Sequence, residues 1–159
     1  MDSDKSLRQH LVELLRGGHA HTKFEDVVAD FPADLRGQKV LNLPHSAWML
    51  LEHMRIAQRD ILEFSRNRKH SSPKWPEGYW PQTDNPPSTE QWNASVKQFG
   101  SDLKEMEDLV KNPKTDLFAK IPWGDGQTIL REALLVADHN AYHLAQIVDV
   151  RRLLGAWEQ

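Results

Sequence analysis

The sequence predicts an all-α protein, a bundle of four helices, and three observations favour this fold class. Four stretches carry apolar residues three and four positions apart, the spacing that lines one face of a helix. Capping residues, glycines or prolines bound these stretches. No stretch alternates apolar and polar residues as a strand would. The chain has 159 residues, 39% of them hydrophobic and 27% charged, which is typical of a single globular domain spanning residues 1–159.

The first two predicted helices lie in the N-terminal half. The first covers residues 5–16 and ends at Gly17, because glycine favours helix termination. A long connection follows, and its segment 24–31 has the spacing for one or two further helical turns. The second helix covers residues 45–68, since Pro44 stands where a helix can begin and one face of the stretch is apolar.

The connection of residues 70–87 contains five prolines and is therefore predicted to be irregular. We expect its three large aromatic residues to bury against the bundle, so the loop is a structured one; they are Trp75, Tyr79 and Trp80.

The third and fourth predicted helices have clear capping residues. Ser88 and Thr89 can cap the third helix, which stops before Pro113. Thr128 can cap the fourth, which runs to about Leu154.

Composition excludes several classes of function. A net charge of −3 and a pI of about 6.2 favour neither nucleic acid nor an anionic membrane surface as a partner. No apolar run approaches the roughly 20 residues of a membrane span, and the charged N-terminus lacks a secretory signal. The chain has no cysteine, which fits a cytoplasmic protein and limits any metal site to His, Asp and Glu ligands.

The fourth predicted helix carries a polar stripe between apolar flanks. His139 and His143 are four residues apart and therefore point from one helix face, with Gln146 following on the same face. Two imidazoles one turn apart can reach a single ion. The pair alone is also compatible with surface histidines or with hydrogen-bonded core histidines.

A third histidine, His53, lies on the apolar face of the second predicted helix. A lone histidine there can be a hydrogen-bonded core residue. His53 lies roughly 12 Å along the helix axis from the start of its helix, and His139 and His143 lie roughly 17 and 22 Å from the start of theirs. If the second and fourth helices run parallel, as in an up-and-down bundle, the three histidines are then at similar heights. We therefore expect three imidazoles to converge. His45, as a capping or surface residue, and the loop pair His19 and His21 are weaker candidates, and His10 and His70 look solvated.

The segments LLEHMRIAQRDIL (50–62) and DHNAYHLAQIVDVRRLLG (138–155) together resemble the DinB/YfiT-like superfamily of metalloenzymes, and the likeness covers nearly the whole chain. The resemblance implies a four-helix bundle with a divalent ion, zinc or nickel, on His53, His139 and His143. Relatives often have Gly-Gln after the last histidine, where this chain has Ala145-Gln146.

Three neutral histidine ligands leave an ion at least one open position, the pattern of a catalytic site. The resemblance implies a metal-dependent hydrolase or an enzyme that uses a low-molecular-weight thiol, such as an S-transferase, acting on a small-molecule substrate. It also implies a homodimer. The alternatives are a non-catalytic metal-binding or stress-response protein and an interaction module without metal.

No general base is assigned from the sequence. Glu132 shares the histidine face but can equally form a salt bridge near the helix start, and Asp138 points about 100° away from His139. We expect the loops 17–44 and 113–127 to form the pocket mouth, or merely to seal the bundle end. The residues that they would bring near the metal are Phe24, Phe31, Trp123 and Asp125, with Trp48 on the first turn of the second helix.

Overall fold

The computed structural model describes residues 3–157, which form helices joined by loops. The helices are α1 (Ser3–Arg16), α2 (Phe24–Val28), α3 (Ala47–Arg66), α4 (Thr89–Lys111) and α5 (Ile129–Leu153), with a 3-10 turn, η1 (Glu77–Tyr79), between α3 and α4. Within residues 3–157 there is no β-strand, only an isolated bridge between Lys120 and Thr128. The four long helices confirm the predicted fold class, and α2 lies in the segment for which extra turns are predicted.

Side-chain caps explain where the three longest helices begin. The hydroxyls of Ser46, Ser88 and Thr128 each accept a hydrogen bond from the backbone N–H three residues further on, at 3.2, 3.2 and 3.1 Å. Helix α3 therefore begins after Ser46 rather than at His45. Gly17, with a φ of 65°, follows the last residue of α1 in the left-handed conformation that favours glycine at this position.

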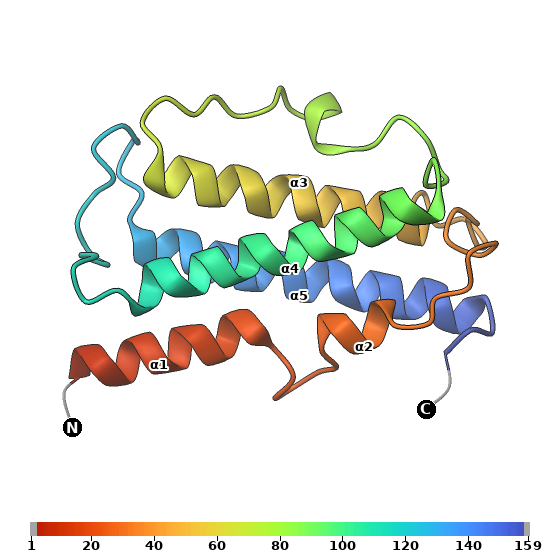
Figure 1. Ribbon diagram of the computed structural model, residues 1–159, viewed down its shortest axis with the longest axis horizontal. Helices are drawn as coiled ribbons and strands as arrows, with labels where there is room; N and C mark the ends of the chain where they lie inside the picture. The colour runs from red at the N-terminus through yellow and green to blue at the C-terminus, as the bar shows by residue number, and fades with distance from the viewer. Residues whose placement is uncertain (1–2, 158–159) are drawn as a thin grey trace.

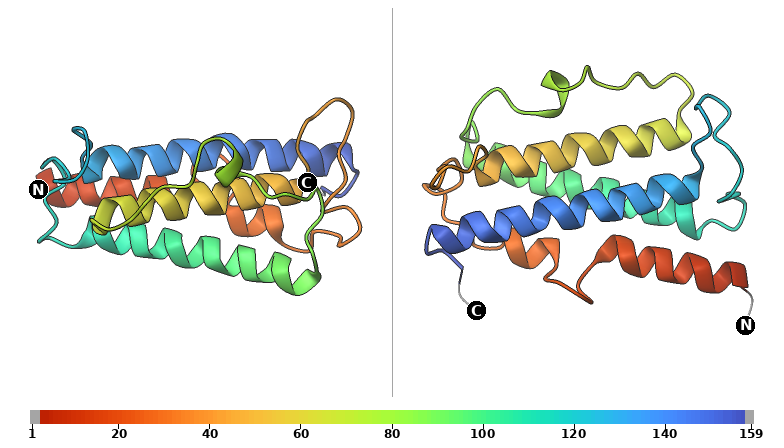
Figure 2. Two further views of the ribbon diagram at one scale, coloured as in Figure 1. Left: turned by 90° about the horizontal axis from the view of Figure 1, so that it is seen from above. Right: turned by 180° about the vertical axis from the view of Figure 1, so that it is seen from behind.

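Helices α3 and α4 run parallel to each other and antiparallel to α1 and α5 (Figures 1 and 2). The expectation that the helices carrying the histidines run parallel is therefore wrong. The indole N–H of Trp123, shortly before α5, donates to the carbonyl of Phe64, near the end of α3, at 2.7 Å. The start of α5 thus lies beside the end of α3, and the end of α5 lies beside the start of α3.

This arrangement depends on the connection between α3 and α4, residues 67–88. It runs back along the length of α3 as an extended segment, so that α4 starts at the same end of the bundle as α3 (Figures 1 and 2). Tyr79 and Trp80 are partly buried, as predicted. Trp75 is 68% exposed, so the expectation that it is buried is wrong.

The core fills the space between the four long helices. Large side chains that are almost fully buried line it along its length: Leu50, Leu51, Met54, Leu62, Trp92, Phe99, Met106 and Ile147. Burial of these apolar surfaces is the main force that holds the helices together. None of the helices within residues 3–157 is both long and apolar enough to cross a membrane.

Candidate metal centre

The structure brings together the three histidines that the sequence singles out. His53 projects from α3, and His139 and His143 project from one face of α5. One ring nitrogen from each lies within 4.8 Å of the others, and the Nε2 atoms of His53 and His139 are 3.0 Å apart. The cluster forms across the antiparallel contact between α3 and α5, in the half of the bundle where α3 begins and α5 ends.

Burial keeps these imidazoles neutral. His53 is only 4% exposed, and the other two are partly buried. Burial, together with the neighbouring rings of His143 and His53, lowers the pKa of His139 to about 4. Burial also lowers the pKa of His53 and of His143 below the ordinary histidine value. Near pH 7 each ring therefore has one nitrogen with a free lone pair, which is the form that binds metals.

Hydrogen bonds orient two of the three rings. His53 Nδ1 lies 2.9 Å from the carbonyl oxygen of Tyr79, and His143 Nδ1 lies 2.6 Å from the side-chain oxygen of Gln146. Because a carbonyl oxygen only accepts, each Nδ1 carries the proton and donates it. Both rings then present an unprotonated Nε2. Outer hydrogen bonds of this kind fix the tautomer of metal-binding histidines.

Trp80, from the connection 67–88, covers one side of the cluster. Its ring stacks on His53 and on His45, with ring centroids 4.0 Å apart in both pairs. Asp60 on α3 anchors this connection, because it accepts a 2.6 Å hydrogen bond from the Tyr79 hydroxyl and lies 2.7 Å from His70 Nε2. The packing of Trp80 agrees with the expectation of a structured loop, whereas the predictions of a solvated His70 and of His45 as a cap or surface residue are wrong.

The expected pocket mouth is also wrong, because it rested on parallel helices. Trp123 packs at the far end of α3. Phe24 stacks on Phe99, with ring centroids 4.0 Å apart, and Phe31 packs against Trp92, so both belong to the core rather than to a mouth. Trp48, also only 3% exposed, is part of the same core.

The other polar residues singled out lie away from the cluster. Asp125 belongs to the same far-end loop as Trp123 and is exposed. Glu132 is 2% exposed and forms an ion pair with Arg131 at 2.7 Å, while Asp138 faces solvent. His21 hydrogen-bonds its neighbouring backbone and joins no metal-binding group among the described residues.

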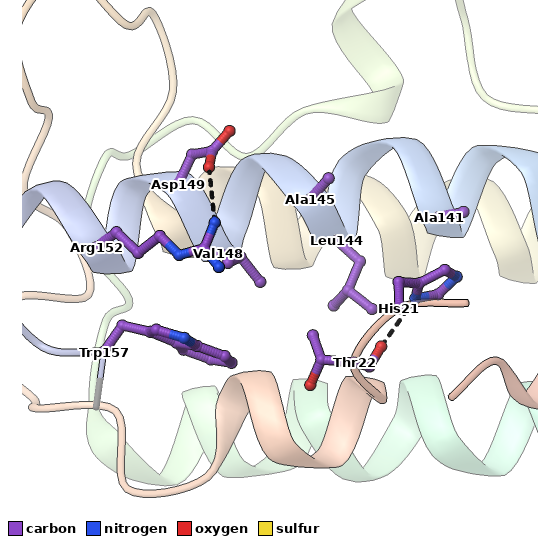
Figure 3. A pocket seen from close by; sticks show the side chains of 9 residues that line it. All are labelled: His21, Thr22, Ala141, Leu144, Ala145, Val148, Asp149, Arg152 and Trp157. Carbon is purple, nitrogen blue, oxygen red and sulfur yellow. Dashed lines mark hydrogen bonds and ion pairs between the residues drawn. The ribbon is translucent and has the colours of Figure 1, made fainter. Parts of the chain in front are cut away.

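A cavity of about 370 Å³ lies beside α5, between this helix and the segments that carry Thr22 and Trp157 (Figure 3). It is mostly apolar, and Ala141, Ala145 and Val148 of α5 line it together with Trp157. These residues point away from the face that carries His139 and His143, since they lie roughly half a turn around the helix. The cavity therefore does not lead to the histidine cluster.

The geometry of the cluster fits a single divalent ion. Two histidine nitrogens bound to one tetrahedral zinc ion lie about 3.3 Å apart, because each Zn–N bond is about 2.0–2.1 Å. The Nε2 atoms of His53 and His139 are already near this spacing, and small side-chain rotations bring in His143. Imidazole donors suit zinc, nickel, copper and iron. The three-histidine group could thus hold a metal ion.

Comparison with known proteins identifies the family of the chain. The family model of the DinB superfamily matches residues 16–147. The chain belongs to the DinB superfamily. The matched range includes α2, α3, α4 and α5 as far as Ile147, and so contains all three clustered histidines. No curated protein and no solved structure matches the chain. The helical bundle described above is the fold of the DinB superfamily, so the resemblance seen in the sequence is confirmed.

Proposed function

We propose that this DinB protein binds one divalent metal ion through His53, His139 and His143 and acts as a metal-dependent enzyme on a small molecule. The reaction class that we propose is hydrolysis or S-transfer with a low-molecular-weight thiol. The observation that carries the proposal is the convergence of three neutral imidazoles, two of them held by hydrogen bonds with Nε2 unprotonated.

The protein's own residues have distinct tasks in this proposal. The Tyr79 carbonyl and the Gln146 side chain hold the outer protons of His53 and His143. Trp80 stacks on His53 and keeps water from that face of the ring. An ion with three neutral ligands retains its positive charge and an open position, so it can lower the pKa of a bound water or thiol. Because Glu132 is ion-paired and Asp138 is exposed, we assign neither a role in catalysis.

A second candidate function is non-catalytic metal binding, in which the ion stabilises the bundle. The stacking of Trp80 on His53 favours it, because this contact restricts access to the cluster from one side. This candidate shares the metal site and differs only in turnover.

Metal analysis followed by activity measurements tests the proposal. Protein stripped with a chelator is incubated separately with zinc and with nickel, and bound metal is measured by elemental analysis after gel filtration. We expect one ion per chain. Turnover is then measured with a panel of ester and amide substrates, and with low-molecular-weight thiols plus an electrophile. Metal-dependent turnover supports the enzyme, stoichiometric binding without turnover supports the second candidate, and failure to bind either ion refutes both.

A further inference from the structure

Two adjacent residues of α5 each carry a buried polar atom that has no hydrogen-bond partner among the described residues. The two atoms are Nδ1 of His139 and Oδ1 of Asn140. Asn140 is only 9% exposed, so water does not readily supply the missing partner. Unpartnered buried polar atoms are uncommon in folded proteins, and they call for a physical reason.

Hydrogen bonds on its other side fix the orientation of the Asn140 amide. Gln58 on α3 donates from Nε2 to the backbone carbonyl of Phe99 on α4 at 2.7 Å, which turns its Oε1 towards α5. Asn140 Nδ2 donates to this oxygen at 2.8 Å. Because the Phe99 carbonyl only accepts, neither amide can flip without losing a hydrogen bond. Asn140 Oδ1 therefore remains as an acceptor beside His139.

Among the residues that the structure describes, His139 is the one clustered histidine whose Nδ1 has no acceptor. A neutral ring that binds an ion through Nε2 carries its proton on Nδ1, and that proton needs an acceptor. Burial lowers the pKa of His139, and the Asn140 side chain acts in the opposite direction, as a nearby oxygen would. Adjacent helical residues point about 100° apart, and because Gln58 holds the Asn140 amide, a rotation of the His139 ring would complete the contact.

We infer that Asn140 is a positioning residue whose Oδ1 accepts the Nδ1 proton of His139 when His139 Nε2 binds the ion. The inference rests on the proposed metal site. In the structure His139 Nε2 donates to the unprotonated Nε2 of His53. When the ion binds, the ring stays neutral and its single proton moves to Nδ1, so that the Nε2 lone pair faces the ion. The Phe99 carbonyl, Gln58, Asn140 and His139 then form one hydrogen-bonded chain from the backbone of α4 through α3 to the centre. Both unpartnered atoms are satisfied in this arrangement.

The test compares zinc-loaded protein, labelled with ¹⁵N-histidine, for the wild type and three variants. In the wild type, NMR should show a slowly exchanging proton on His139 Nδ1. Asn140→Leu removes the acceptor at similar volume, and we expect this proton signal to be lost and zinc affinity to fall roughly ten- to hundredfold in a chelator competition. Asn140→Asp keeps the acceptor and should retain both the signal and the affinity. Asp138→Ala is the matched control, because Asp138 is exposed and adjoins His139 on the other side.

The outcomes separate this inference from the proposed function. A wild type that binds no zinc refutes both. A wild type that binds zinc, together with an Asn140→Leu variant of unchanged affinity and unchanged Nδ1 proton signal, refutes the inference alone. If Asn140→Leu does not fold, as judged by circular dichroism, Gln58→Leu replaces it. That variant frees the Asn140 amide and should weaken zinc binding severalfold, and unchanged affinity would overturn the inference.

Discussion

The contact between α1 and α4 and the contact between α3 and α5 both bury polar side chains, but they satisfy them in different ways. Between α1 and α4, the nearly buried carboxylate of Glu107 accepts hydrogen bonds from Arg16 and from Lys111, both at 2.8 Å. Between α3 and α5, the Nε2 atoms of His53 and His139 face each other at 3.0 Å. In the first contact charge meets opposite charge, whereas in the second the nitrogens of neutral imidazoles gather around one point.

This difference distinguishes a structural ion pair from a site for a ligand. The Glu107 cluster is complete within the protein, because each charge has a partner of opposite sign. The histidine cluster contains more nitrogen lone pairs than hydrogen-bond donors to satisfy them. A cation is the partner that three lone pairs can share. Changes at Glu107 should therefore alter folding without altering metal affinity, whereas changes around the histidines should alter metal affinity.

The largest expected effect follows from His143→Ala. Removal of one of three ligands should abolish stoichiometric binding of zinc or nickel, with affinity reduced at least about a hundredfold. The helical circular dichroism signal should stay, because His143 is only partly buried. Elemental analysis after gel filtration measures the effect, and the exposed His19 provides a matched His19→Ala control. Full metal occupancy in His143→Ala would show that the cluster is not the metal site.

A smaller effect on the same cluster is expected from Gln146→Leu. This change removes the acceptor that lies 2.6 Å from His143 Nδ1 while all three ligands remain. Zinc affinity should fall about tenfold, or about 1.4 kcal/mol, in a chelator competition. Gln146→Glu keeps an acceptor at this position and should bind zinc as the wild type does. Equal loss in both variants would mean that the hydrogen bond does not orient His143.

The smallest effect concerns the other cluster. Glu107→Gln should cost about 1 kcal/mol of unfolding free energy at pH 7, because Arg16 and Lys111 are partly exposed and their attraction is screened. Zinc affinity should not change. Urea unfolding of both proteins measures the difference, with Asp138→Asn as a control for loss of an exposed carboxylate. A change in zinc affinity would contradict the separation of the two clusters.

The same variant has a predicted pH dependence. Burial alone would raise the pKa of Glu107, but hydrogen bonds from Arg16 and Lys111 outweigh burial and hold this pKa below its usual 4.5. A carboxyl group with a lowered pKa in the folded state stabilises the protein above its unfolded pKa, and this contribution is lost as the pH falls through the folded pKa. The difference between wild type and Glu107→Gln should thus shrink as the pH falls below 4.5 and through the lowered pKa of the folded state.

The sequence predicts the helices well because their boundaries are local. Side-chain caps, prolines and glycines place the bounds of α3, predicted as 45–68 and observed as Ala47–Arg66, within two residues. The identity of the clustered histidines is also local in part, since His139 and His143 share a helix face. The predicted reason for the contact of His53 with this pair is wrong, because α3 and α5 are antiparallel rather than parallel (Figure 1).

Helix direction could not be derived, because it depends on the path of residues 67–88. A connection of this length can either turn back at once or span the bundle, and proline content predicts only that it is irregular. The contacts of Trp80 with His53 and of the Tyr79 carbonyl with His53 Nδ1 follow from that path. The misplaced pocket mouth at Trp123 has the same origin, since it assumed that α3 and α5 start at one end.

The histidines that face each other across α3 and α5 are 86 residues apart in the chain. Neither helix alone supplies three ligand nitrogens, so an ion would bind the folded chain far more tightly than the unfolded one. The ion would therefore stabilise the folded chain by mass action. We expect contacts between residues so distant in sequence to form after the rate-limiting step, because the helices have to dock first. Such an ion would therefore lengthen the lifetime of the native state by slowing its unfolding, and it would leave the rate of folding nearly unchanged.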